Sequence, residues 1–550
     1  MKKHVFISLL AAFVATITLS SCSTHKKSSS NVSNDSISSN PSSDSSQSNS
    51  GDVHNYRKEP MIISDNHATE SEFTFKFDSV TFKESDSLKN GENFYTPEQF
   101  AFDFREVRDG EDFDDPATVG YQRVLVIPVK FADDKSVSAC NKLDGGCDKA
   151  LDDIEKAFFG DPSYTGWESV SSYYYKSSYG KLKLQGRVTD WFHLNRTSTA
   201  VNSLSSTLYA DPSFYVLREA SKWYENNYGD LSYYDQDNDG LVDAVWLVYD
   251  RPYSRTGSDT WWAYTYWDFE NTSRALKPYT YAWASVSFLY EGKYTKNGVL
   301  VPDAHTFIHE TGHVLGLDDY YNYDDDSNYG AAGKIDMMDY NIGDHCAYSK
   351  MLLGWTMPKV VTGSTTISIN PFESSGDCIL LRDEKTWNKT PMDEYLLIEF
   401  VTPTGLNYQD SVVTYTGGVK HFSQPGIKIY HIDSRLAVYD AYGYFKNYTD
   451  SLTTSSRGES VSIAHSNTPS RSVSSNFLVH LLEATQINSF KNGAAANNDT
   501  LFVQGNQFTP TRFQSFFNNR TNLNDGTAIG YNISIDSITS NKATLTFTKI

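Results

Sequence analysis

Residues 309–319 read His-Glu-Thr-Gly-His-Val-Leu-Gly-Leu-Asp-Asp, and this run constrains the local backbone more than any other part of the chain. On a helix, His309 and His313 lie one turn apart on the same face, close enough to bind one metal ion. Gly316 can end that helix, because glycine tolerates the left-handed backbone of a sharp turn. The chain then doubles back, and Asp319 supplies an oxygen ligand. The sequence therefore predicts a helix, a tight turn and a three-ligand site.

The types of ligand predict zinc with a catalytic role. Zinc binds histidine nitrogen and carboxylate oxygen in a tetrahedron, and three protein ligands leave the fourth position for water. Glu310 follows the first histidine and is predicted to act as the general base toward that water. Asp303 is expected to cap the helix, and His305 is expected to be structural. A third ligand from a later helix is the alternative to Asp319.

A second motif supports the first. Residues 335–340 read Ile-Asp-Met-Met-Asp-Tyr and resemble the Met-turn of the metzincins, in which a methionine forms an apolar floor beneath the metal ligands. Met338 fits that role best. Tyr340 then matches a tyrosine that some metzincins place near the metal, where a phenol can hydrogen-bond an oxyanion. Ordinary core packing of the two methionines is the alternative.

Together these motifs resemble the immune inhibitor A type of bacterial metallopeptidase, over about residues 120–440. Further agreement comes from residues 178–182, 235–243, 350–355 and 425–433. The resemblance implies a zinc endopeptidase with a metzincin-like α/β (α+β) domain, acting on protein or glycoprotein substrates outside the cell. Asp318 stands where that family commonly has proline, so two adjacent carboxylates compete for the role predicted for Asp319.

The first 21 residues predict a lipoprotein signal peptide. Lys2 and Lys3 precede an apolar stretch that is too short to be a spanning helix. The stretch ends in Leu-Ser-Ser-Cys, which resembles the bacterial lipobox and predicts acylation of Cys22. We therefore expect export and lipid anchoring of the protein at the surface of a bacterial membrane. An ordinary signal peptide with a chance cysteine is the alternative.

Composition divides the rest of the chain. Residues 22–52 are mostly Ser, Asn and Asp, which predicts a flexible tether, and residues 53–118 form an N-terminal segment or a prosegment. In residues 119–360 apolar runs alternate with helical patterns, as expected of a mixed α/β catalytic domain. The resemblance to metzincins implies that the strand at 281–290 borders the cleft and pairs with extended substrate; an ordinary buried strand is the alternative. Residues 361–550 show short alternating runs, which predict a β-rich region, as a β-sandwich.

Export makes disulfides possible for the remaining four cysteines. Cys140 and Cys147 bracket a turn-forming loop, which predicts that they pair. Cys346 and Cys378 either pair or stay buried as small apolar residues. The even number favours two bridges.

An acidic loop at residues 235–243 predicts calcium. Asp235, Asp237, Asp239 and Asp243 occupy positions one, three, five and nine of an EF-hand-like loop, with glycine at position six. Position twelve is Trp246 rather than glutamate, so the loop is not a full EF-hand. An Asx-rich turn without metal is the alternative.

The formal net charge of −21 disfavours a nucleic-acid partner, which would require a basic surface. A different class of function remains open: a surface lipoprotein whose β-rich half binds a host protein or glycan, with zinc only structural. Glu310 disfavours it, because a structural zinc site has no use for a base.

Overall fold

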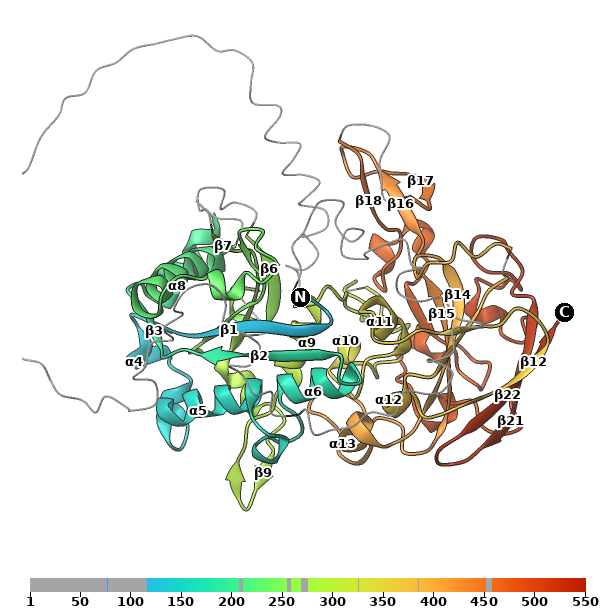
Figure 1. The fold of residues 1–550 in the computed structure, drawn as a ribbon, viewed down its shortest axis with the longest axis horizontal. Coiled ribbons are helices and arrows are strands. Elements are labelled where there is room, and N and C mark those ends of the chain that lie inside the picture. The colour runs from blue at the N-terminus through green and yellow to red at the C-terminus, as the bar shows by residue number, and fades with distance from the viewer. Residues whose placement is uncertain are drawn as a thin grey trace, which may run out of the picture.

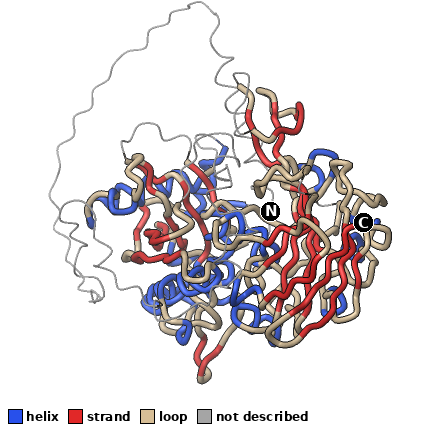
Figure 2. The backbone as a smooth tube through the Cα atoms, turned by 45° about the vertical axis from the view of Figure 1, so that its right-hand side comes forward, coloured by secondary structure: helices blue, strands red, loops and turns tan. Residues whose placement is uncertain are grey.

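The computed structural model describes residues 77, 116–206, 211–254, 259–268, 276–324, 326–383, 385–451 and 458–550. The predicted signal peptide, Cys22, the tether and most of residues 53–118 lie outside this part of the chain. The protein is mixed α/β, with strands gathered into two groups and helices between them (Figures 1 and 2). Among the described residues, no helix is long and apolar enough to cross a membrane.

The first half is built on one mostly parallel sheet with the strand order β2-β1-β5-β8-β6. Strands β2, β1, β5 and β8 are parallel, and β6 pairs antiparallel with β8 at the edge. The short strand β3 (Phe192–Leu194) pairs with the end of β1. The strands are β1 (Gly120–Phe131), β2 (Leu182–Val188), β5 (Val245–Tyr249), β6 (Tyr264–Trp267) and β8 (Thr280–Ser285). Helices cover both faces, which explains why β1 and β5 read as continuous apolar runs.

Alternate residues of β1 belong to two hydrophobic cores, one on each face of the sheet. Val124 and Val126 pack with three helices, α5 (Gly146–Phe159), α6 (Val170–Ser177) and α9 (His305–Val314). Leu125 and Ile127 pack with α8 (Pro212–Tyr228) on the opposite face. This alternation follows from the two-residue period of a strand. It places α9, which carries the metal motif, firmly against the sheet.

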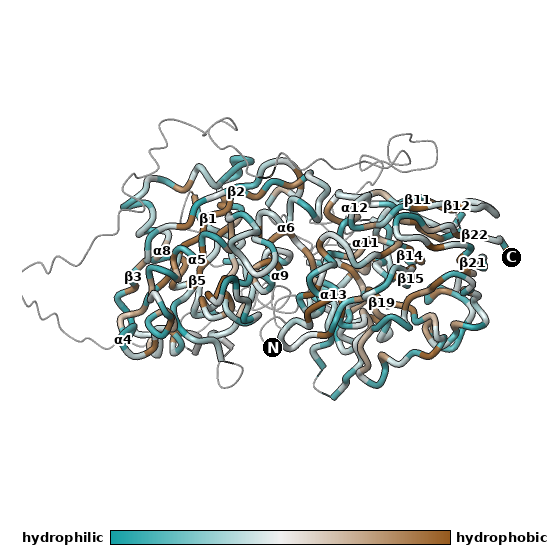
Figure 3. Tube along the Cα trace, turned by 90° about the horizontal axis from the view of Figure 1, so that it is seen from below, coloured by the Kyte–Doolittle hydropathy of each residue, from teal (hydrophilic) through white to brown (hydrophobic). Residues whose placement is uncertain are grey.

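The described part of the second half contains three further sheets. The smallest has the order β17-β16-β18 and consists of β16 (Leu436–Tyr439), β17 (Phe445–Thr449) and β18 (Ser460–Ile463). Of the two larger sheets, one has the order β11-β13-β14-β15-β19 and the other the order β12-β22-β21-β20. Their strands are β11 (Lys359–Val360), β12 (Thr365–Ile369), β13 (Cys378–Leu381), β14 (Glu394–Val401), β15 (Gly426–Asp433), β19 (Val479–Leu481), β20 (Gln507–Phe508), β21 (Tyr531–Ile538) and β22 (Ala543–Lys549). One hydrophobic cluster takes Ile398 and Ile429 from the first sheet and Ile533 and Leu545 from the second. Figure 3 shows hydrophobic segments inside both halves of the molecule.

The two halves share a core. Helices α9, α10 (Met337–Tyr340) and α11 (Ala347–Leu352) lie between the first sheet and strands β14 and β15 (Figure 1). Met338, Met351, Leu397 and Tyr430 belong to the same hydrophobic cluster as Val124 on β1. The boundary expected at residue 360 therefore separates the sheets of the two halves, but one hydrophobic core extends across it.

One disulfide forms where the loop predicted it, between Cys140 and Cys147. The second bridge favoured by the even number of cysteines is wrong, because Cys346 and Cys378 are both free and buried. Each thiol contacts a hydroxyl instead: the Sγ of Cys346 lies 3.8 Å from the Oγ of Ser349, and the Sγ of Cys378 lies 3.9 Å from the Oγ1 of Thr356. Both cysteines belong to the shared core, where a thiol serves as a small apolar group.

The strand expected to border the cleft is also corrected. Residues 280–285 form β8, which is paired on both sides, with β5 and with β6. An extended substrate cannot pair with an interior strand. In the described part of the chain the last strand on this side of the sheet is β6 (Tyr264–Trp267), which no strong sequence pattern marked.

Candidate metal centre

Helix α9 runs from His305 to Val314 and ends where the sequence predicted. Gly316 has a φ of +101°, in the region that favours glycine, and the chain reverses there. At the other end the N-cap residue is Ala304 rather than Asp303. The Asp303 carboxylate nevertheless accepts a hydrogen bond from the backbone N–H of His305 at 3.1 Å, so it still satisfies a free N–H of the first turn.

His309, His313 and Asp319 converge on one point. The Nε2 atoms of the two histidines lie 3.2 Å apart, and the Oδ1 of Asp319 lies 3.0 Å from one and 3.1 Å from the other. A tetrahedral zinc ion with bonds of about 2.1 Å separates its ligand atoms by about 3.4 Å. The three atoms are therefore spaced nearly as zinc requires. All three side chains are buried, with exposed fractions of 5%, 7% and 8%.

Backbone carbonyls fix the tautomer of both histidines. The Nδ1 of His309 lies 2.7 Å from the carbonyl oxygen of Met337, and the Nδ1 of His313 lies 2.7 Å from that of Leu317. A carbonyl only accepts, so each Nδ1 carries a proton and each Nε2 is left to bind a metal ion or, when no metal is bound, a proton. The two Nε2 atoms and the Asp319 oxygen, which are 3.0 to 3.2 Å apart, can therefore share one cation. The donor set therefore fits a metal ion.

The close approach of these groups shifts the pKa values of His313 and Asp319. Burial alone would lower the pKa of His313, but Asp319 and Glu310 raise it to about 9. Burial would raise the pKa of Asp319, yet His313 and His309 hold it well below its usual value. Both shifts show that the site favours a positive charge among these groups.

Glu310 is positioned beside the ligands by β6. The hydroxyl of Thr265 on β6 donates to the backbone oxygen of Glu310 at 2.9 Å and approaches its Oε2 at 3.4 Å. Burial raises the pKa of Glu310, while His313 and His309 lower it. A carboxylate with a raised pKa is suited to accept and return a proton. Thr265 could not have been found from the sequence, because only the sheet brings β6 to α9.

Met338 lies directly beneath the metal-binding helix. Its Sδ would lie only 2.5 Å from a Cβ placed on Gly312, so any larger residue at position 312 would collide with it. The carbonyl of Met338 accepts from the N–H of Tyr320, which anchors the loop that follows Asp319. The segment therefore supports both the helix and the ligand-bearing loop, as a methionine floor would.

Tyr340, predicted to hydrogen-bond an oxyanion, has different neighbours. Its side chain is 36% exposed, and its ring lies 5.6 Å from the Nζ of Lys334. None of its contacts is with a ligand. Two other phenols lie at the site: Tyr323 donates a hydrogen bond to the Oδ2 of Asp319, and Tyr321 stacks on His309 with ring centroids 6.3 Å apart. Nothing in the sequence distinguished these two among 37 tyrosines.

Tyr323 is itself held from the second half of the chain. The guanidinium of Arg471 lies 4.4 Å from the centre of the Tyr323 ring. The hydroxyl of Thr468 accepts from the backbone N–H of Tyr323 at 3.1 Å. The segment around residues 467–471 thus packs on the loop that carries Asp319.

Replacing Tyr323 by Phe is expected to weaken zinc binding about 10- to 100-fold, because the unbound oxygen of Asp319 loses its donor. Zinc affinity would be measured by competition with a chromogenic chelator. Tyr442→Phe is the matched control, since Tyr442 is 66% exposed. Equal zinc affinity in Tyr323→Phe and the unaltered protein would show that this hydrogen bond does not orient the ligand.

His305 is structural, in keeping with the sequence expectation. Its two ring nitrogens face Asp303 at 2.5 Å and Asp410 at 3.4 Å. Trp167 and Tyr415 stack on its ring. Burial would lower its pKa, but the two carboxylates raise it to about 10. A charged imidazolium therefore links the start of α9 to α13 (Tyr408–Val412) in the second half.

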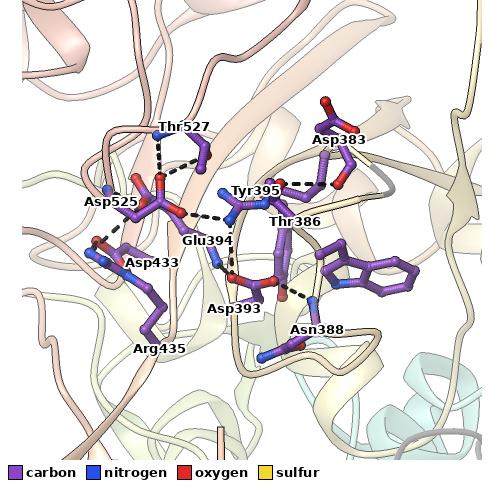
Figure 4. Close-up of polar contacts among 12 residues, drawn as sticks. Asp383, Thr386, Asn388, Asp393, Glu394, Tyr395, Asp433, Arg435, Asp525 and Thr527 are labelled. Atoms are coloured by element: carbon purple, nitrogen blue, oxygen red, sulfur yellow. Dashed lines mark hydrogen bonds and ion pairs between the residues drawn. The ribbon is translucent and has the colours of Figure 1, made fainter. Parts of the chain in front are cut away.

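A second buried polar cluster lies in the second half and serves a structural purpose (Figure 4). Arg382 donates to Asp525 at 2.6 Å, and Arg435 donates to Asp433 at 2.7 Å. Glu394 accepts from the backbone N–H of Asp525 at 2.8 Å. These ion pairs join β14, β15 and the loop around residue 525. The two arginines pair with carboxylates within the protein.

The structure also brings together Asp235, Asp237 and Asp239, in the loop that precedes β5. Comparison with known proteins adds no assignment for any of these sites: no model of a protein family matches the chain, and no curated protein matches it.

Proposed function

We propose that this protein is a zinc endopeptidase. The observation that carries the proposal is the convergence of His309, His313 and Asp319 on one point, with the Glu310 carboxylate beside it. Zinc, when bound there, polarises a peptide carbonyl and lowers the pKa of water. Glu310 accepts the proton of the attacking water and returns it to the leaving amine.

The proposed fold of the first half is metzincin-like. Support comes from the helix that carries two ligands, the turn at Gly316 and the methionine segment beneath them. The antiparallel strand β6 lies next to α9, where the hydroxyl of Thr265 contacts Glu310. The two larger sheets of the second half share one core, which supports a β-sandwich.

The proposed setting is the bacterial cell surface. The lipobox-like run before Cys22 supports a lipid anchor, and the bridge between Cys140 and Cys147 fits an oxidising compartment. The resemblance to the immune inhibitor A type supports protein or glycoprotein substrates.

A cavity in the second half favours a second function, the binding of a host protein or glycan. Its volume is about 230 Å³, with His431, Asn476 and Asn524 on its polar side and Tyr329 and Phe477 among its aromatic residues. Amide groups and aromatic faces together suit a sugar or a polar side chain. Under this alternative the zinc site is structural, and the protein cleaves nothing.

The test combines metal analysis with cleavage of casein. The peptidase predicts one equivalent of zinc at the triad and cleavage that stops when the metal is chelated. Since residues 53–118 are a candidate prosegment, the assay is run on the full chain and on a chain that begins at Val119. A folded, zinc-loaded shorter chain that cuts no protein substrate would refute the peptidase.

A further inference from the structure

The backbone of the loop at residues 235–243 brings several carboxylates together. The N–H of Gly240 donates to the Oδ2 of Asp235 at 3.1 Å, and the N–H of Leu241 donates to the Oδ1 of Asp239 at 2.6 Å. Asn238 and Gly240 have φ values of +65° and +92°. These turns fold the backbone so that the carboxylates of positions one, three and five face one another. The carboxylate oxygens of Asp235, Asp237 and Asp239 all lie within 4.8 Å of one another.

Two buried oxygen atoms point to a missing ligand. The Oδ1 of Asp235 and the Oδ1 of Asp243 are shielded from solvent and have no hydrogen-bond partner among the described residues. Their side chains are only 6% and 4% exposed. A buried carboxylate oxygen without a donor is costly, because it has lost its water and gained nothing in return. An Asx turn explains the oxygens that accept backbone N–H groups, but not these two.

The charges of the loop also require neutralisation. In the described part of the chain, no Lys or Arg forms an ion pair with any of the four aspartates. Several carboxylates gathered without a salt bridge to lysine or arginine are an arrangement that a divalent ion stabilises.

The loop is fastened to the first strand of the main sheet. The side chain of Gln236 donates to the carbonyl of Tyr121 on β1 at 2.7 Å and accepts from the N–H of Arg123. The Nε2 of Gln122 donates to the Oδ2 of Asp243 at 3.2 Å. Hydrogen bonds therefore tie the conformation of the loop to β1, and β5 begins shortly after the loop, at Val245.

We propose that residues 235–243 form a calcium site, in which Asp235, Asp237, Asp239 and Asp243 supply oxygen ligands and the bound ion stabilises the sheet of the first half. Calcium fits better than magnesium, because it accepts irregular sets of carboxylate oxygens, whereas magnesium requires near-octahedral geometry. The site is independent of the zinc triad and does not rest on the peptidase proposal.

Metal binding and thermal unfolding test the site without any cleavage assay. The purified protein is stripped of divalent ions, reloaded with zinc, and titrated with Tb³⁺, whose luminescence the tyrosines next to the loop sensitise. We expect a saturable signal that Ca²⁺ displaces and equimolar Mg²⁺ does not. We also expect 1 mM Ca²⁺ to raise the melting temperature by roughly 5 °C. Absence of both effects would overturn the proposal.

The double variant Asp237→Asn, Asp239→Asn tests whether calcium binds at this loop. Both side chains are exposed, so the variant should fold, and circular dichroism at low temperature checks this. It should lose at least about a hundredfold in calcium affinity and show no calcium-dependent shift in melting temperature. Asp144→Asn, on another exposed loop, is the matched control and should behave as the unaltered protein. Unchanged Ca²⁺ binding in the double variant would place the ion elsewhere and refute the assignment. If the double variant does not fold, Asp237→Asn alone is judged by the same criterion.

Discussion

Replacing Glu310 by Gln is expected to reduce peptide cleavage at least about a hundredfold, in a protein that still folds and binds zinc. Glutamine keeps the size of the side chain and can still accept the hydrogen bond from Thr265. It cannot accept a proton from the attacking water. General acid–base assistance contributes about 10² to 10⁴ in rate, so this single change should remove most of the activity.

Three measurements on each form are needed: zinc content, melting temperature and the rate of cleavage of an unstructured protein. Glu155→Gln is the matched control, because Glu155 is exposed on α5 and far from the ligands in sequence. If the protein only binds a target, the unaltered protein should hydrolyse nothing, and Glu310→Gln should leave target binding unchanged. Retention of full cleavage by Glu310→Gln would exclude this residue as the base.

The second large effect is expected from Asp319→Ala, which should lower zinc affinity by more than about a hundredfold. That exceeds the roughly 10- to 100-fold contributed by groups that only orient a ligand, because Asp319 supplies one of only three donor atoms. Asp318→Ala should change zinc affinity little. The structure explains the difference: Asp319 is buried against both histidines, whereas Asp318 is exposed.

Competition with a chelator at constant pH measures both variants, and cleavage should fall in step with zinc loading. The two variants are well matched, because each removes one carboxylate and the two positions are adjacent. If Asp318→Ala loses zinc and Asp319→Ala keeps it, the assignment of the ligand is reversed.

The sequence by itself determined the local elements of this protein. The apolar runs and helical patterns expected in residues 119–360 include β1 and α8, and the turn at Gly316 follows α9. Apolar periodicity and glycine act over a few residues, so their consequences can be read from the chain. The same holds for His309, His313 and Asp319, which lie within eleven residues of one another.

Only the tertiary structure decided which distant side chains complete the site. Thr265 reaches Glu310 from a different strand, Asp410 reaches His305 from the second half, and Tyr323 rather than Tyr340 holds a ligand. Tertiary structure also left Cys346 and Cys378 unpaired, and it placed β6 rather than β8 at the edge of the sheet. Contacts of this kind depend on the order of strands and on how the two halves pack. A local pattern cannot encode them, because it carries no information about which segments become neighbours in space.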